Sequence, residues 1–306
     1  MGYINTTGVG GEIRKFANDA KMHSWGIEST ISSRNIATKD WEWGTDLTFS
    51  YTHTEIKNLL AQSTVMGLIY DSGSNIRKGY PHRSLFSIPF VGLNDEGLPQ
   101  FINEKGELTV TELNFQEFQN LDFLHYEGST EPTFTGGLNN TLRWKNWRLN
   151  VFITYSFGNK IRLDPVFASA YSDMSAMPKE FKNRWVLPGD EMKTDIPTIA
   201  SVRQYRNYAA STNPLSYAYN AYNYSTARVA DGGFIRMKDI SLTYDFEKSL
   251  INHIGLSTAS LKVDVTNPFL IYSDSKLNGQ DPEYVMSGGV SSPLSRQITL
   301  TLRLGI

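Results

Sequence analysis

Hydrophobic and polar residues alternate along several stretches of this chain. In residues 147–157 the odd-numbered positions are apolar or aromatic, whereas the even-numbered ones are polar apart from Phe152. Successive side chains of a β-strand point to opposite faces, so this period of two predicts a strand with one apolar and one polar face. The pattern recurs and predicts seven strands, at 22–33, 41–53, 134–145, 147–158, 233–246, 259–270 and 295–306.

Alternation alone fits either a soluble β-sandwich or a transmembrane β-barrel. Three further features favour the membrane. The stretches run about 10 to 13 residues, whereas soluble strands have about 5 to 6 and tilted membrane strands need about 9 to 11. The connections are alternately short and long, as are the periplasmic turns and outer loops of a barrel. Aromatic residues lie beside the short connections, where amphipathic rings mark a membrane interface: Trp41, Trp43, Trp144, Trp147 and Phe246.

The polar positions define the face that would line the interior of such a barrel. We expect five charged residues there: Arg143, Arg148, Lys262, Asp264 and Arg303. On the opposite face we expect one apolar band that meets lipid, which includes Val151, Ile153, Leu242, Val263 and Leu300. Bacterial single-chain barrels have even strand numbers from about 8 upward, so seven strands do not close one. The predicted fold class is therefore all-β, an antiparallel transmembrane β-barrel segment that belongs to a larger barrel.

Composition excludes several other classes of protein. The net charge of −2 and the absence of Lys or Arg runs argue against nucleic acid as a partner. The chain has no cysteine, which excludes a disulfide framework, a thiolate metal site and a cysteine nucleophile. No apolar run approaches the roughly 18 residues of a membrane-spanning helix.

No catalytic, metal-binding or cofactor-binding motif is found in the sequence. The five histidines are scattered and form no metal-binding pair. Nucleophile elbows and phosphate-binding loops are also missing. We therefore expect a protein that is not an enzyme and that has no metal or cofactor.

Aromatic residues are concentrated in the long connection at 159–232. Flat rings with polar edges stack on sugars or anchor a partner protein, which suggests a binding role. A long ordered loop also needs its own small core, so the same rings are equally suited to packing the loop against itself. The candidate substrate- or partner-binding residues are Trp185, Tyr205, Tyr217, Tyr219, Tyr222 and Tyr224, and Tyr171 and Tyr208 belong to the same group of aromatics.

Five segments, in order along the chain, resemble the SusC/RagA family of TonB-linked outer-membrane importers of Bacteroidetes. The longest is PTFTGGLNNTLRWKNWRLNVFITYSFGNKI (132–161), which resembles a late barrel hairpin of the family, and the most specific is DGGFIRMKDISLTYDF (231–246). The others are WGIESTIS (25–32), NRWVLPGD (183–190) and NPFLIYSDSKLNGQDPE (267–283). Together they are spread over nearly the whole chain, from residue 25 to residue 283.

The resemblance implies that residues 1–306 are the C-terminal third or less of a longer protein with a barrel of about 22 strands. The signal peptide, TonB box, plug domain and early strands then lie outside this chain. The implied location is the cell outer membrane, and the implied partners are outer-membrane lipid, a SusD-like surface lipoprotein and, through the absent N-terminal part, the TonB complex. The implied function is import of oligomeric nutrients, glycans or peptides. The alternative is a soluble or surface-exposed β-rich module that binds carbohydrate or protein.

Overall fold

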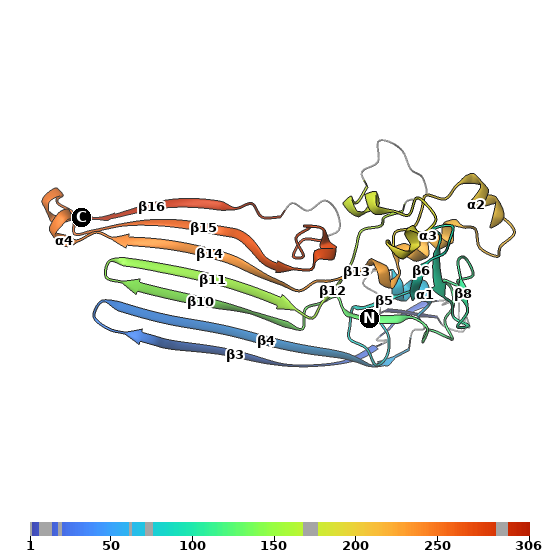
Figure 1. Cartoon of the computed structure of the whole chain (residues 1–306). Helices are drawn as coiled ribbons and strands as arrows, with labels where there is room; N and C mark the ends of the chain where they lie inside the picture. The colour runs from blue at the N-terminus through green and yellow to red at the C-terminus, as the bar shows by residue number, and fades with distance from the viewer. Residues whose placement is uncertain are drawn as a thin grey trace. The chain divides into compact units, whose positions relative to one another are not determined.

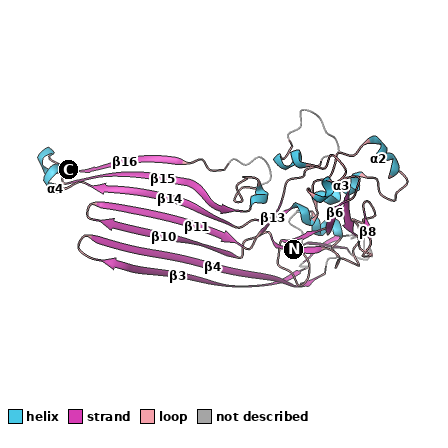
Figure 2. Ribbon diagram, in the orientation of Figure 1, coloured by secondary structure: helices cyan, strands magenta, loops and turns pink. Residues whose placement is uncertain are grey.

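The computed structural model describes residues 2–5, 14–17, 20–60, 63–70, 76–167, 177–285 and 293–306, with the backbone alone for the first two segments. The chain divides into two compact units. Unit 1 comprises residues 1–24, 53–131 and 160–230, and unit 2 comprises residues 25–52, 132–159 and 231–306. Figures 1 and 2 show the helices and strands of both units.

Unit 2 is built on an antiparallel sheet of seven strands in the order β16-β15-β14-β11-β10-β4-β3. The strands are β3 (Ala20–Ala37), β4 (Trp41–Leu59), β10 (Phe134–Trp144), β11 (Trp147–Phe157), β14 (Phe234–Asp245), β15 (Thr258–Ser273) and β16 (Gln297–Gly305). Each predicted range overlaps one of these strands. Strands β3 and β4 reach 18 and 19 residues and extend into unit 1, which makes them longer than the alternation predicted.

Short turns join the strands at one end of this sheet. Trp144 pairs with Trp147 across the two-residue turn at 145–146, where Lys145 has a φ of +51°. Thr38 closes the β3–β4 turn, because its hydroxyl accepts a hydrogen bond from the Trp41 N–H at 3.0 Å. Helix α4 (Lys248–Ile251) and the 3₁₀ helix η4 (Asn252–Ile254) lie in the β14–β15 connection.

A β-bulge interrupts the alternation in β14. Met237 and Asp239 pair with the consecutive β11 residues Ile153 and Phe152, which leaves Lys238 as an extra residue relative to β11, and the register with β15 shifts at the same place. Residues on either side of the bulge keep their pairing: Asp239 lies opposite Phe152, and Arg236 lies opposite Thr154.

Unit 1 consists of short elements around a hydrophobic core. Its strands are β1 (Gly2–Asn5), β2 (Arg14–Ala17), β5 (Ser84–Ser87), β6 (Phe90–Leu93), β7 (Pro99–Ile102), β8 (Leu108–Thr109), β9 (His125–Ser129), β12 (Lys160–Arg162) and β13 (Val229–Asp231), the last of which ends in unit 2. Its helices are α1 (Val65–Ile69), α2 (Val202–Asn207) and α3 (Ser216–Asn223), with 3₁₀ helices η1 (Lys179–Asn183), η2 (Asp190–Met192) and η3 (Thr226–Arg228). The chain has a further 3₁₀ helix, η5 (Ser275–Leu277), in unit 2.

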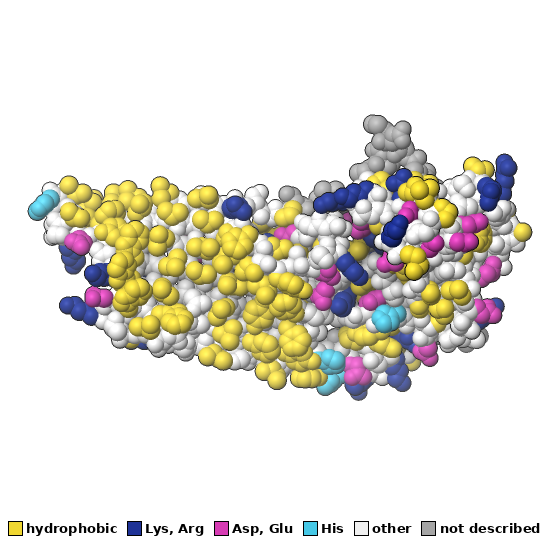
Figure 3. Space-filling model, in the orientation of Figure 1, with side chains coloured by type: hydrophobic (Ala, Val, Ile, Leu, Met, Phe, Trp, Pro, Cys, Tyr) yellow, Lys and Arg dark blue, Asp and Glu magenta, His cyan; other side chains and the backbone are white. Residues whose placement is uncertain are grey.

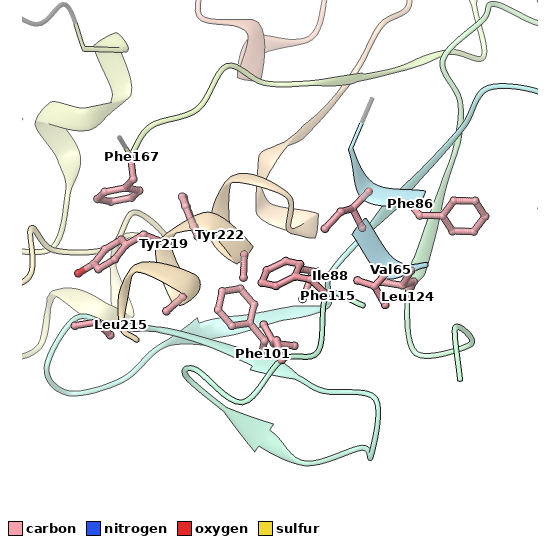
Figure 4. Packing of buried hydrophobic residues seen from close by; sticks show 14 of the residues in the cluster. Val65, Phe86, Ile88, Phe101, Phe115, Leu124, Phe167, Leu215, Tyr219 and Tyr222 are labelled. Carbon is pink, nitrogen blue, oxygen red and sulfur yellow. The ribbon is translucent and has the colours of Figure 1, made fainter. Parts of the chain in front are cut away.

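The core of unit 1 joins residues from both long connections. Phe86, Ile88 and Phe101 come from the first connection, and Phe167 and Tyr222 come from the second. Figure 4 shows their side chains packed together. The described parts of the two long connections in unit 1 therefore pack into a core, and their strands of two to five residues are too short to produce a visible alternation.

Arg162 fastens the two connections to each other inside unit 1. Its guanidinium donates to the Ser87 hydroxyl at 3.0 Å, the Ser225 carbonyl at 3.1 Å and the Phe86 carbonyl at 2.6 Å. Charge-assisted hydrogen bonds of this kind are stronger than neutral ones.

Among the described residues, no helix is long and apolar enough to cross a membrane.

Candidate functional site

The seven-stranded sheet of unit 2 has one polar face. Arg143, Arg148, Thr243 and Lys262 form a single row across four neighbouring strands. Asp264 lies two residues further along β15, and Arg303 lies opposite Ser260, two residues in the other direction. Because side chains two residues apart share a face, all five charged residues that the sequence singled out lie on the polar face.

Ion pairs connect this face from strand to strand. Glu42 lies 3.2 Å from the Arg34 guanidinium and 4.0 Å from that of Arg143. The Arg148 guanidinium lies 3.6 Å from the Asp245 carboxylate. Lys262 lies 3.0 Å from Asp264 on the same strand. These pairs are solvent-accessible, so each contributes about 0 to 1 kcal/mol. Their alternating signs make a hydrated, mixed-charge surface.

The opposite face is apolar and uncovered. Leu142, Leu149, Leu242, Val263 and Leu300 form one row across five strands. A second row contains Val151, Ile240, Val265 and Ile298, and Ile153 follows in a third. Side chains of Leu242, Leu300 and Ile298 are 41%, 68% and 73% exposed. Figure 3 shows hydrophobic side chains gathered over these strands. Such an area of exposed apolar surface is unusual for a soluble protein and typical of a protein or membrane contact.

Glycines leave room for aromatic rings on both faces of this sheet. On the apolar face, Tyr155 reaches over Gly136 and its hydroxyl donates to the Thr48 carbonyl at 3.2 Å. On the polar face, the Phe152 ring lies against Gly137. Phe152, the exception in the alternating pattern, therefore covers a position where the neighbouring strand has no side chain.

A small polar cluster interrupts the apolar face near β3. The Asn140 amide oxygen accepts hydrogen bonds from the Trp43 indole at 3.0 Å and the Thr45 hydroxyl at 2.8 Å. Thr45 in turn accepts from the Asn35 amide at 2.8 Å. These mutual hydrogen bonds reduce the cost of placing polar groups on an apolar surface.

The aromatic candidates of unit 1 are placed very differently from one another. Tyr219 and Tyr222 are only 7% and 1% exposed, and they pack against Phe167 with ring centroids 4.8 and 5.6 Å away (Figure 4). Burial raises the pKa of Tyr222 far above its ordinary value. The expectation of a binding role is corrected for these two residues, because their rings lie inside the core.

A sequence signal for this burial exists. Leu215, Ala218, Tyr219 and Tyr222 are spaced i, i+3, i+4 and i+7, which is the apolar stripe of a helix, and all four are buried in and beside α3. Tyr217 falls off that stripe and is 41% exposed, while Tyr205 on α2 is 46% exposed. Tyr224 is partly buried beside Tyr70, with ring centroids 5.8 Å apart. Tyr171 lies outside the described residues.

Trp185 is fixed in a turn formed by residues 185–191. Its indole N–H donates to Glu191 at 2.8 Å, and its ring lies so close to Gly97 that a side chain there would overlap it. The Asp190 carboxylate accepts from the backbone N–H groups of Leu187 at 3.0 Å and Val186 at 3.3 Å. Trp185 therefore shapes this turn, as expected for a ring that packs a long loop against itself.

Among the described residues, no group of three or more His, Asp or Glu side chains is arranged to hold a metal ion. The residues predicted from the sequence did not include Arg236, a basic residue of the polar face that is buried and paired with Asp281 and Glu283. The bulge at Lys238 breaks the alternation just there, so the pattern assigned Arg236 to no face.

No protein-family model matches the chain. Curated relatives do. The chain is 26% identical over 291 residues to TonB-dependent receptor P3 of Formosa agariphila, a match that covers 90% of the chain and 26% of that protein. It is 22% identical over 305 residues to TonB-dependent receptor SusC of Bacteroides thetaiotaomicron, which covers 94% of the chain and 27% of that protein.

Solved structures of the RagAB peptide transporter share the fold. One superposes with a TM-score of 0.68 at 20% identity and covers 98% of this chain and 31% of that chain. The structure of the RagAB importer in its open-open state gives a TM-score of 0.69 at 18% identity and covers 99% of this chain. The chain thus spans about a quarter to a third of the length of the proteins it matches.

Proposed function

The chain is a relative of the SusC-type TonB-dependent receptors, which are outer-membrane proteins, and from this premise we propose that it forms the C-terminal part of an importer barrel. The observation that carries the proposal is the sheet of unit 2, with one uncovered apolar face and one charged face. In the proposed arrangement, the apolar face meets lipid and the polar face lines the lumen. Arg143, Arg148, Lys262, Asp264 and Arg303 are then lumen-lining residues.

The edges of the sheet support a larger barrel. Strands β3 and β16 lie at the two edges, and the backbone groups of an open edge have no hydrogen-bond partner in lipid. We therefore propose that strands from outside this chain pair with both edges, which gives a closed barrel of about 22 strands.

The proposed cargo is an oligomeric nutrient, either a glycan or a peptide, and the proposed partner is a SusD-like surface lipoprotein. RagAB, which shares the fold, is a peptide transporter. For this chain, the exposed aromatics Tyr205 and Tyr217 are the best-placed candidates for contact with cargo or lipoprotein. Tyr224 and Trp185 rank below them, because Tyr224 is partly buried and Trp185 is held in its turn. We propose transport and no catalytic role.

A soluble or surface-exposed β-rich binding module is the alternative. It would use the same aromatic residues. The uncovered row of Leu142, Leu149, Leu242, Val263 and Leu300 disfavours it, because in water such a row needs a second layer to cover it.

Substitution of the exposed aromatics tests the proposed contact. In the complete protein, Tyr205→Ala combined with Tyr217→Ala should reduce recovery of the co-expressed lipoprotein, uptake of an oligomeric substrate, or both. Phe118→Ala is the control, since this ring is similarly exposed at 47% but lies in the other connection. Unchanged partner recovery and unchanged uptake would show that these tyrosines contact neither the lipoprotein nor the cargo. Deleting the segment is unsuitable, because α3 supplies core residues.

A further inference from the structure

The end of the sheet opposite the short turns carries a buried charge on its polar face. Arg236 lies in register with Thr154 of β11 and Leu270 of β15, and its side chain is 7% exposed. Thr154 shares a face with Phe152, Asn150 and Arg148, because they are two residues apart. Arg236 therefore projects from the face that also carries Lys262 and Asp264.

Both acidic partners of Arg236 come from one segment beyond β15. The guanidinium forms an ion pair with Asp281, and its Nε lies 3.1 Å from a carboxylate oxygen of Glu283. Lys238, the extra residue of the bulge, lies 3.9 Å from the other Glu283 oxygen. The guanidinium also lies over the Phe234 ring, 5.6 Å from its centroid. The bulge thus gathers two basic residues against two acidic ones.

The segment at 274–285, called the strap below, is held at both ends. At its start, the Asp274 carboxylate accepts the backbone N–H of Asp231 at 2.8 Å and that of Lys276 at 2.9 Å. In its middle, Leu277 is buried. Near its end, Asp281 and Glu283 meet Arg236. The strap is therefore fastened to the polar face instead of extending away from the sheet.

We propose that Arg236 clamps this strap across the polar face, and that the strap narrows the passage at the end opposite the short turns. The narrowing rests on the proposed function, in which the polar face lines a lumen. Removing one partner of a buried ion pair leaves an uncompensated charge, so loss of the Arg236 guanidinium should favour release of the strap. Arg236, Asp281 and Glu283 are therefore positioning residues that hold the strap in place.

Labelling of an engineered cysteine tests the proposal, because the chain has no cysteine of its own. The reporter is Thr266→Cys, a polar-face position that pairs with Asp239 on the short-turn side of Arg236. Two membrane-impermeant maleimides, one small and one attached to a polyethylene glycol chain, are added to cells that contain the complete protein. The measured quantity is the ratio of the large-reagent rate to the small-reagent rate.

With the clamp intact, we expect the large reagent to label slowly relative to the small one. Arg236→Met should raise the ratio about tenfold or more, because the released strap no longer narrows the passage. Arg236→Lys keeps the charge and the fold but loses the two-pronged contact, so it should give an intermediate ratio. Arg296→Met is the matched control, since Arg296 donates to the Pro268 carbonyl at 2.8 Å and does not hold the strap.

A parallel reporter separates the two ways in which the proposal can fail. Val265→Cys lies on the apolar face, so aqueous reagents should not reach it if that face meets lipid. If Val265→Cys and Thr266→Cys label alike, the orientation of the sheet and hence the proposed function are wrong. In the second case, the two reporters differ as expected, but neither Arg236→Lys nor Arg236→Met changes the labelling ratio measured at Thr266→Cys. That result would overturn the strap proposal alone.

Discussion

At the scale of single residues, Gly136 sets how closely β10 approaches its neighbours. A Cβ atom at this position would lie 2.2 Å from the Thr48 carbonyl oxygen and 2.4 Å from the Tyr155 hydroxyl. Gly136→Ala should therefore destabilise the sheet by about 1 to 3 kcal/mol through overpacking. The measurement is the midpoint of denaturant unfolding of the complete protein in detergent.

Gly44→Ala is the control for this prediction. The nearest atom to a Cβ there is the Ser33 carbonyl oxygen at 3.6 Å, which is ordinary contact. We expect this variant to unfold close to the parent midpoint. Equal effects of the two alanines would contradict the close approach at Gly136.

Neighbouring residues on β15 test the assignment of the two faces. Val265 lies on the apolar face in register with Ile240 and Ile298, whereas Thr266 lies on the polar face beside Asp239. Val265→Arg should cost about 2 to 4 kcal/mol near the membrane midplane. Thr266→Arg should be tolerated, because a hydrated face with a carboxylate nearby accepts the charge. Both free energies come from reversible unfolding in lipid vesicles, and similar values would refute the assignment.

At the scale of elements, the turn at 185–191 should open in acid. The indole of Trp185 lowers the pKa of Glu191, and the backbone N–H groups of Leu187 and Val186 lower the pKa of Asp190. A carboxylate with a depressed folded-state pKa stabilises the turn above its unfolded pKa, and that stability is lost as the pH falls through the folded value. The Trp185 contribution to fluorescence should stay constant from about pH 7 to 5 and shift to the red only below about pH 4.

The fluorescence contribution is the difference between the protein and its Trp185→Phe variant. Glu191→Gln keeps an acceptor for the indole but does not titrate. In this variant the red shift in acid should be smaller, because only the protonation of Asp190 still contributes to it. A transition that is unchanged in Glu191→Gln would show that the Glu191 carboxylate does not hold the turn.

How far the sequence predicts each element depends on its length and regularity. The sheet of unit 2 was predictable because its strands are long and alternate, and side chains such as Leu242 and Thr243 reveal their faces by parity alone. The strands of unit 1 have two to five residues and hold too few positions to show a period. Their packing depends on contacts between distant segments, such as Arg162 with Phe86, which no local pattern encodes.

The residues of the candidate site also divide into those that a local sequence pattern predicts and those that it does not. Five charged residues of the polar face were found from parity, whereas Arg236 was not, because the bulge at Lys238 shifts the pattern. Among the aromatics, composition could not separate Tyr217 from Tyr222. Only the helical spacing of α3 does so, and it places Tyr222 on the buried side.

At the scale of the whole molecule, the apolar face decides how the chain behaves in water. The chain made alone leaves that face and both sheet edges without cover, so it should aggregate without detergent. Analytical ultracentrifugation measures this directly. A monodisperse monomer in detergent-free buffer would support the soluble-module alternative and contradict a membrane location for the sheet.

The central claim is that one face of this sheet meets lipid and the other meets water, and β15 offers the most direct measurement. Spin labels are placed one at a time at positions 261 to 266 of the complete protein in lipid vesicles, and their accessibility to oxygen, which partitions into lipid, and to a water-soluble nickel complex is recorded. The account predicts a period of two: oxygen reaches 261, 263 and 265, and the nickel complex reaches 262, 264 and 266. Accessibility without alternation, or with the nickel complex reaching all six positions, would contradict it.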